Sequence, residues 1–123
     1  MRAFVVVHPP SEPIFLLSSP GAPDVYKGIL SKAAEYLAAN DVVYHMRSNS
    51  RLKLKGDLEG AVEIYRSKLE DQAQAVLDDM AEKGIDDVVL SGFRRNICVA
   101  QVAEYSTSHN PSVPVKIAEE LCL

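Results

Sequence analysis

The sequence predicts an α/β fold, a three-layer α/β/α sandwich built on a mostly parallel, Rossmann-like sheet. Short apolar runs rich in β-branched residues alternate with amphipathic helical segments, which is the element order of parallel βαβ units. These runs are apolar at consecutive positions, as expected of strands covered on both faces. The chain has 123 residues, 47% of them hydrophobic, enough for one core. We therefore expect a single domain over residues 1–123.

The first part of the chain predicts two parallel strands joined by a helix. Ala3–Val7 indicates a buried central strand that ends at His8. The prolines and glycine that follow indicate a loop, in which residues 14–17 form an apolar anchor. Apolar residues at every fourth position predict a helix over Asp24–Asn40, and the next strand is expected at Val42–Tyr44. A right-handed connection through one helix makes these strands parallel.

A polar loop, a short strand and a second helix are expected in the middle of the chain. Residues 47–59 show no helical or strand period, and their basic side chains are typical of solvated surface. These basic residues are Arg47, Arg51, Lys53 and Lys55. A strand is expected at residues 62–65. Ser67 and Glu70 then have the spacing of a capping box, and an apolar helical face continues to Gly84.

The last third of the chain predicts a strand, a helix and a final strand. Val88–Leu90 is expected to be the third parallel strand, and Asn96 is placed to cap the helix that follows. Val113–Ile117 has strand character, although Pro114 within it lacks an N–H group for one side of a ladder. We therefore expect this last strand at an edge of the sheet.

Composition narrows the class of partner. A formal net charge of -4 and a pI near 5.3 give no electrostatic drive towards nucleic acid or anionic membranes, so neither is expected as a partner. No apolar run approaches the length of a membrane span, and the N-terminus lacks the pattern of an export signal, so we expect a cytoplasmic protein. A small-molecule ligand is the expected partner.

The cysteines and histidines indicate neither disulfides nor metal. Cys98 and Cys122 are too few for a disulfide scaffold and match no zinc spacing, so both are expected to be free thiols. His8, His45 and His109 show no ligand spacing to one another. We therefore expect no metal site and no cofactor.

The segment from Gly92 to Cys98, where an apolar strand passes through a glycine turn into a helix, is the strongest candidate for chemistry. Ligands of such sheets bind outside the carboxyl ends of the strands, the edge at which His8 is also expected. Gly92 is expected to need a positive φ or a close backbone approach. A thiol in the first helical turn faces unpaired N–H groups and the positive end of the helix dipole, which favour thiolate, as do Arg94 and Arg95. Cys98 is therefore the candidate nucleophile.

The run from Gly92 to Val99 resembles the nucleophile segment of the isochorismatase-like cysteine hydrolases, a superfamily that includes nicotinamidases and carbamoylsarcosine amidases. In that family a strand after a Gly-Ile helix end leads through a glycine turn to Cys-Val. Here Gly84-Ile85 precedes the strand, Cys98-Val99 follows the turn, and Glu120-Leu121-Cys122 is similar to a later acidic-small-Cys stretch. The motif covers residues 84–99, while the order of elements agrees over most of the chain. The resemblance implies an isochorismatase-like topology.

The resemblance also implies a catalytic triad and an oxyanion hole. The family's nucleophile corresponds to Cys98, whereas its aspartate base falls at His8 and its lysine at Tyr65. The family's oxyanion hole uses backbone N–H groups, here those of Arg94 and Cys98, beside a non-proline cis peptide bond that corresponds to Phe93-Arg94. Two of the three triad positions therefore hold residues of another type.

Each candidate side chain has a structural interpretation beside the functional one. Cys98 is a nucleophile or a small hydrophobic residue at the start of a buried helix. His8 is a base for Cys98 or a strand-end histidine bonded to a loop carbonyl. Arg94 and Arg95, the latter replacing a threonine of the family, bind a substrate carboxylate or form a solvated surface pair. The family's metal ligands have no counterpart in this sequence.

Two functional interpretations stay open. In the first, the protein is a hydrolase that cleaves an amide or related bond of a small metabolite through Cys98 and a non-standard triad. In the second, it is a catalytically degenerate member of the same fold that serves as a small-molecule-binding or assembly module. A nucleotide-binding module is a third class, but the sequence lacks a glycine-rich phosphate loop. A homo-oligomer is expected from the family and from the edge position inferred for Pro114.

Overall fold

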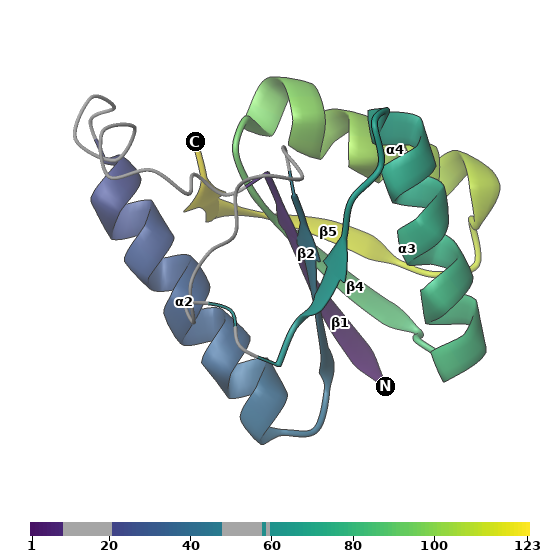
Figure 1. Ribbon diagram of the computed structural model, residues 1–123, viewed down its shortest axis with the longest axis horizontal. Coiled ribbons are helices and arrows are strands. Elements are labelled where there is room, and N and C mark those ends of the chain that lie inside the picture. Colours follow the sequence, from purple (N-terminus) through teal and green to yellow (C-terminus); the bar gives the residue numbers. More distant parts are fainter. Residues whose placement is uncertain (9–20, 48–57, 59) are drawn as a thin grey trace.

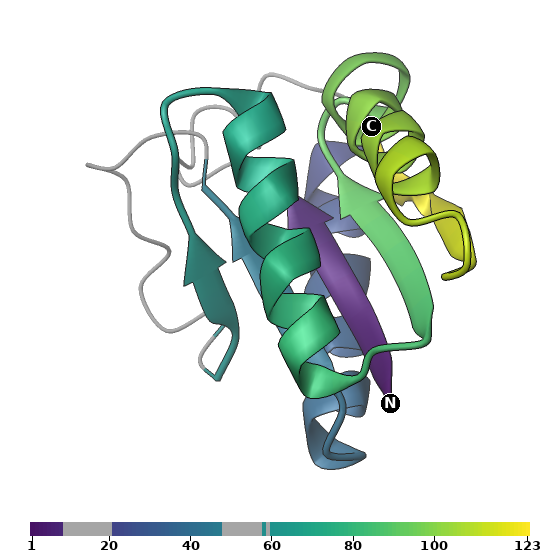
Figure 2. The same ribbon diagram turned by 90° about the vertical axis from the view of Figure 1, so that its right-hand side faces the viewer.

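A five-stranded sheet lies between two helical layers in the computed structural model, which describes residues 1–8, 21–47, 58 and 60–123 (Figures 1 and 2). The strand order is β3-β2-β1-β4-β5, and every neighbouring pair is parallel. The predicted three-layer α/β/α sandwich is therefore confirmed. The strands are β1 (Arg2–Val7), β2 (Val42–Met46), β3 (Val62–Ile64), β4 (Asp87–Gly92) and β5 (Val115–Cys122). The helices are α2 (Ala22–Ala38) on one face and α3 (Leu69–Lys83) and α4 (Ala100–His109) on the other.

The central strand β1 contributes to a hydrophobic core on each face of the sheet. Phe4 and Val6 belong to the core under α2, whereas Val5 and Val7 belong to the core under α3 and α4. This division follows from the two-residue alternation of side chains along a strand. Since both faces are covered, β1 is apolar at each of these consecutive positions.

The predicted strands and helices are present, with some of their ends shifted. The first helix begins at Ala22, and Asn40 lies just beyond its end with a φ of 61°, as a helix-terminating residue does. The final strand, Val115–Cys122, is longer than predicted and pairs with β4 at the sheet edge. Because β5 is the last strand in the order, the inferred edge position is correct. Pro114 precedes this strand, and its carbonyl accepts the Val88 N–H at 3.1 Å.

Both N-caps predicted from the sequence are wrong. The helix α3 begins at Leu69 with Lys68 in the N-cap position, and no side chain caps it, so Ser67 does not complete a capping box. Asn96 lies inside a π-helical turn instead of capping a helix. For Asn96 the reason is the π-turn after β4, which begins one residue earlier and so includes Asn96.

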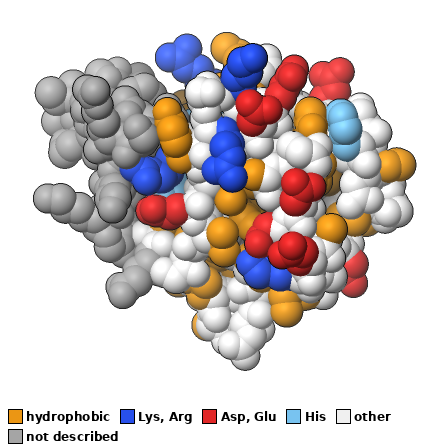
Figure 3. Space-filling model, turned by 45° about the vertical axis from the view of Figure 1, so that its right-hand side comes forward, with side chains coloured by type: hydrophobic (Ala, Val, Ile, Leu, Met, Phe, Trp, Pro, Cys, Tyr) orange, Lys and Arg blue, Asp and Glu red, His pale blue; other side chains and the backbone are white. Residues whose placement is uncertain are grey.

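Some of the sequence predictions fall outside the described residues, namely the apolar anchor at residues 14–17 and the basic side chains of Arg51, Lys53 and Lys55. Within the described part of the chain, no helix combines the length and the apolar character needed to cross a membrane. On the face shown in Figure 3, acidic and basic side chains are interspersed with scattered hydrophobic ones. Hydrophobic side chains scattered in this way are ordinary on a protein surface.

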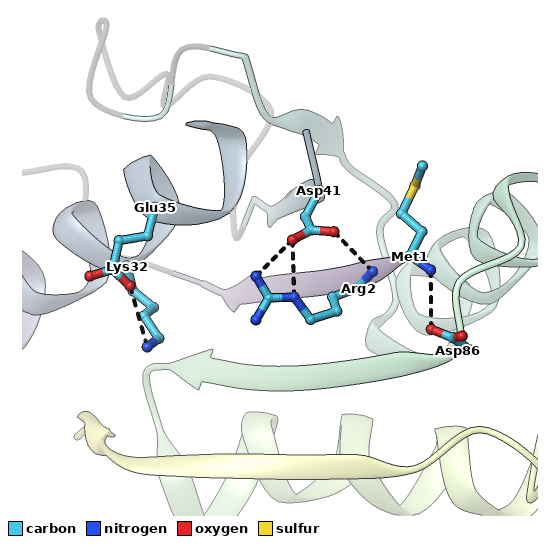
Figure 4. A network of polar contacts seen from close by, with 6 residues as sticks. All are labelled: Met1, Arg2, Lys32, Glu35, Asp41 and Asp86. Atoms are coloured by element: carbon cyan, nitrogen blue, oxygen red, sulfur yellow. Dashed lines mark hydrogen bonds and ion pairs between the residues drawn. The ribbon is translucent and has the colours of Figure 1, made fainter. Parts of the chain in front are cut away.

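Ion pairs fix the amino-terminal edge of the sheet, opposite the carboxyl edge that holds the candidate residues (Figure 4). The Asp41 carboxylate accepts hydrogen bonds from the Arg2 guanidinium, 3.0 Å from Nε and 2.8 Å from Nη2. This bonding holds the pKa of Asp41 below its ordinary value. The Met1 amino group pairs with Asp86 at 3.2 Å. These contacts join the start of β1 to the starts of β2 and β4.

Tyr44 brings a hydroxyl group to the core under α3, where it donates a hydrogen bond to Asp79 Oδ2 at 2.6 Å. Lys83 pairs with the same carboxylate. Burial and the bond to Asp79 raise the pKa of Tyr44, so its hydroxyl stays a donor. We expect Tyr44→Phe to lower the free energy of unfolding by about 1 kcal/mol, because a partly buried hydrogen bond is lost while Lys83 still pairs with Asp79. Urea unfolding measures this loss, and an equal loss in the exposed control Tyr65→Phe would contradict it.

Candidate active site

The carboxyl ends of four strands meet at one edge of the sheet and bring several candidate residues to it. The His8 N–H donates to the Met46 carbonyl at 2.9 Å, and the Arg47 N–H donates to the Ile64 carbonyl at 2.9 Å. The Phe93 N–H donates to the Val7 carbonyl at 3.0 Å. These bonds continue the parallel ladders beyond the strands, so the segments that follow β1, β2, β3 and β4 lie side by side at this edge.

The turn after β4 has the backbone that the sequence predicts. Gly92 has a φ of 124°, and a Cβ atom added to it would lie 2.0 Å from the Val7 carbonyl oxygen. Both the positive φ and the close backbone approach expected of this glycine are therefore confirmed. The Phe93-Arg94 peptide bond is cis, as the resemblance implies.

Cys98 lies in a π-helical turn, Arg95–Val99, which leads directly into α4. The Val99 N–H donates to the Arg94 carbonyl at 3.1 Å, five residues back. Single π-turns of this kind are frequent at functional sites. Apart from hydrogen bonds within a helix, the N–H groups of Arg94 and Cys98 donate to no backbone carbonyl among the described residues. The partly buried Cys98 side chain packs against the core under α3 and α4.

The end of β5 holds this turn in place. The Leu123 N–H donates to the Gly92 carbonyl at 3.1 Å, and the Arg95 N–H donates to the Leu123 carbonyl at 2.8 Å. A cavity of about 590 Å³ opens beside the turn. The described residues that line it are Phe93, Arg94, Arg95, Asn96, Ile97, Cys122 and Leu123. The structure thus brings Arg94 and Arg95 together in one cavity. Cys98 directly follows the lining residue Ile97 in the chain but does not itself line the cavity.

His8 has a backbone φ of 45° and a side-chain partner on α3. Its Nε2 atom lies 2.8 Å from Gln72 Oε1. The Gln72 side-chain amide also donates to the Arg47 carbonyl at 2.6 Å, so one buried side chain bridges the ends of β1 and β2. Within the described residues no hydrogen bond joins His8 to Cys98, and their pairing stays a prediction.

A second polar cluster lies on the neighbouring strands. His45 is 3% exposed, with Nδ1 at 3.9 Å from Glu63 Oε1, and Arg47 Nη1 lies 3.5 Å from Glu63 Oε2. Burial lowers the pKa of His45 to about 4. Arg47 and His8 lower this pKa further, whereas the Glu63 carboxylate opposes them. His45 is therefore neutral near pH 7 and available only as a neutral hydrogen-bonding group.

Tyr65 follows β3 at the same sheet edge, with 36% of the residue exposed. Its carbonyl accepts a hydrogen bond from Arg66 Nη1 at 2.6 Å. In the strand order, β2 separates β3 from β1, so Tyr65 approaches the site from the side away from Cys98. Among the described residues, no hydrogen bond connects Tyr65 to His8 or Cys98. Its place in a triad stays a prediction.

Both cysteines are free thiols, as predicted. Burial raises the pKa of the Cys122 thiol, which lies 3.2 Å from the Ala118 carbonyl oxygen. Among the described residues, no group of three or more histidine, cysteine, aspartate or glutamate side chains is arranged to hold a metal ion.

Gln72 is a buried polar residue at this edge that the sequence patterns did not select. It is 2% exposed and lies in the stripe of α3 that Leu69, Ala73 and Val76 also occupy. An uncharged polar residue on the buried face of a helix needs hydrogen-bond partners, so its position in the helical period was an available signal.

Comparison with solved structures places this chain among proteins of one fold. N-carbamoylsarcosine amidase from Thermoplasma acidophilum is similar with a TM-score of 0.80 and 16% sequence identity, over 99% of this chain and 84% of that chain. An isochorismatase from Pseudomonas putida is similar with a TM-score of 0.77 and 13% identity, over 98% of this chain and 70% of that chain. Pyrazinamidase of Pyrococcus horikoshii, solved in complex with zinc, has a TM-score of 0.75 and 14% identity, over 98% of this chain and 85% of that chain.

No family model and no curated protein matches the sequence. At identities this low, the structural likeness establishes the fold alone, because one fold supports many reactions. The isochorismatase-like topology that the sequence resemblance implies is confirmed.

Proposed function

We propose that the protein is a cysteine hydrolase that cleaves an amide or related bond of a small metabolite, with Cys98 as its nucleophile. The turn from Gly92 to Cys98 is the observation that carries this proposal. It presents a thiol in a π-turn next to the Arg94 and Cys98 N–H groups, which donate to no described backbone carbonyl outside the helical ladders. N-carbamoylsarcosine amidase and pyrazinamidase, whose names denote C–N bond cleavage, have the same fold.

The first half of the proposed reaction forms a covalent intermediate. His8 takes the proton of the Cys98 thiol, and the thiolate attacks the carbonyl carbon of the amide to form an S–C bond. The carbonyl oxygen becomes an oxyanion that accepts hydrogen bonds from the Arg94 and Cys98 N–H groups. The C–N bond then breaks, and the imidazolium of His8 returns the proton to the leaving nitrogen.

The second half restores the enzyme. His8 takes a proton from water, whose oxygen attacks the thioester carbon. The S–C bond breaks, the acid leaves, and the proton returns from His8 to Cys98. One amide and one water molecule thus give one acid and one amine or ammonia.

The remaining candidate residues have binding roles in this proposal. Arg94 and Arg95 line the cavity beside the turn, and their planar guanidinium groups suit a carboxylate of the substrate. In this proposal Tyr65 takes the position of the family's lysine, where its hydroxyl is able to donate a hydrogen bond but supplies no positive charge. We also propose that the protein forms a homo-oligomer, as expected from the sequence.

Alkylation by iodoacetamide tests whether Cys98 is activated. We expect Cys98 to react about tenfold faster than a free thiol near pH 7, and Cys122 to react more slowly because burial raises the pKa of its thiol. Mass spectrometry of the labelled peptides measures both rates. Cys122→Ser should keep the fast reaction, whereas Cys98→Ser should remove it. A Cys98 rate no higher than that of a free thiol between about pH 5 and pH 9 would exclude the activated nucleophile.

Ammonia release from a panel of small primary amides and N-carbamoyl compounds tests the hydrolysis. The wild-type protein is expected to release ammonia from at least one compound, and Cys98→Ser to release none. Binding of an amide with equal affinity by both proteins, without release by either, would instead favour the degenerate binding module.

A further inference from the structure

Gln72 links the segments that follow β1 and β2 through a buried side-chain amide. Its Oε1 atom is 2.8 Å from His8 Nε2, and its Nε2 atom donates to the Arg47 carbonyl at 2.6 Å. Gln72 is 2% exposed, its bond to the Arg47 carbonyl is buried, and its bond to His8 is partly buried. An amide this deeply buried is costly unless both of its ends are hydrogen-bonded, and here both ends are.

The direction of these two bonds fixes which nitrogen of His8 carries the proton. The Arg47 carbonyl only accepts hydrogen bonds, so the amide nitrogen of Gln72 must face it and the amide oxygen must face His8. That oxygen also only accepts, so His8 Nε2 must be the donor. In neutral His8 the basic nitrogen is then Nδ1.

The backbone of His8 explains how its side chain reaches α3. Alternation along β1 places Phe4 and Val6 on the α2 side, where residue 8 would also lie if the strand continued. The φ of 45° at His8 ends this alternation, and the side chain bonds instead to Gln72 on the α3 side. Cys98 packs against the core on that same side.

We propose that Gln72 is a positioning residue that holds the His8 ring on the α3 side, with Nε2 protonated and Nδ1 left as the base for Cys98. The role of Cys98 rests on the proposed function, whereas the state of His8 does not. The proton transfer moves one proton from Cys98 Sγ to His8 Nδ1, and Gln72 Oε1 keeps its hydrogen bond to Nε2–H throughout. Gln72 touches neither substrate nor sulfur in this mechanism and acts through His8.

Other ionisable groups also face His8. From β2, His45 interacts electrostatically with His8, and Arg47, the residue after β2, acts on His45 and bonds to Gln72 through its carbonyl. From β3, Glu63 contacts both of these residues. The helix α3 contributes the uncharged Gln72, and the proposal places Cys98 of the π-turn on the same side of the sheet. Because several ionisable groups lie near His8, a pH profile would not isolate its protonation. Direct detection of the proton on His8 Nε2 is therefore the more decisive measurement.

Nuclear magnetic resonance of the ring nitrogens tests the positioning. In the ¹⁵N-labelled wild-type protein we expect neutral His8 to show one tautomer, with an Nε2–H signal protected from exchange with water. Gln72→Met, which has similar length but no amide, should lose that protected signal. Gln72→Glu should restore it, because a carboxylate or carboxylic acid still offers an acceptor oxygen to Nε2–H. Gln101→Met changes an exposed glutamine on α4 and should leave the signal as in the wild type.

Cys98 alkylation in the same four proteins tests the use of His8. Gln72→Met is expected to slow it about tenfold and Gln72→Glu to restore it, since a misplaced base loses part of its contribution. An unchanged Nε2–H signal in Gln72→Met, or an unchanged rate there when wild-type Cys98 is reactive, would overturn the positioning role. If wild-type Cys98 is not activated, the proposed function fails, and the Nε2–H signal alone still decides the state of His8. Should Gln72→Met not fold, a wild-type His8 without a protected Nε2–H would refute the assignment.

Discussion

Replacing Gly92 with alanine is expected to lower the free energy of unfolding by about 4 kcal/mol or more, placing it among the most damaging single substitutions. A Cβ atom at this position would lie 2.0 Å from the Val7 carbonyl oxygen and 2.7 Å from the Val7 nitrogen. These are backbone atoms of the central strand, and Val7 pairs with Gly92 in the β1–β4 ladder. The clash therefore cannot be relieved by rotating a side chain. A φ of 124° adds strain for any residue with a Cβ atom.

Gly84→Ala is the matched control for this prediction. Gly84 also has a positive φ, 67°, but no heavy atom lies within 4 Å of a Cβ added there. We expect a loss of about 1 kcal/mol, which reflects the left-handed backbone without a clash. Urea unfolding followed by circular dichroism measures both variants. Equal urea midpoints for the two variants would contradict the prediction, because they would show that the backbones of β1 and β4 move apart at little cost.

The fold was predictable from the sequence because its signals are local and repeated. Ala3–Val7 is apolar at consecutive positions, and the structure covers both of its faces. The helical period after Leu69 and the glycine at position 84 define α3 without reference to any other element. Gly92 was recognised because a strand-to-helix turn restricts φ within a few residues of sequence.

The candidate site was predictable only in part, because its side chains meet through contacts between distant elements. The nucleophile turn is local, and the positive φ of Gly92 and the cis Phe93-Arg94 bond agree with the prediction. The partner of His8 is not local: Gln72 is 64 residues away, and the two meet only because a φ of 45° turns the His8 side chain towards α3. Asn96 failed as a predicted cap for a similar reason, since a π-turn after β4 sets where the helix begins.

His45 makes the stability of the protein depend on pH, because burial disfavours its protonated form and Glu63 only partly offsets this effect. Its pKa is lowered from 6.5 to about 4, chiefly by burial. The folded state thus excludes a proton that the unfolded chain binds below pH 6.5. Stability is fully present above that pH and is lost as the pH falls towards about 4. Over the whole window the loss is about 3 kcal/mol, of which about 2 kcal/mol falls between pH 7 and pH 5.

His45→Gln is expected to remove this pH dependence while keeping a polar side chain next to Glu63. Urea unfolding near pH 7 and near pH 5 should show a loss about 2 kcal/mol smaller in the variant than in the wild type. Carboxylates such as Asp41, whose pKa is also lowered, titrate in both proteins and cancel from this difference. His109→Gln, at an exposed position, should keep the wild-type dependence. If His45→Gln loses as much stability between pH 7 and pH 5 as the wild type does, groups other than His45 cause the acid sensitivity. The two proteins differ only at this buried histidine.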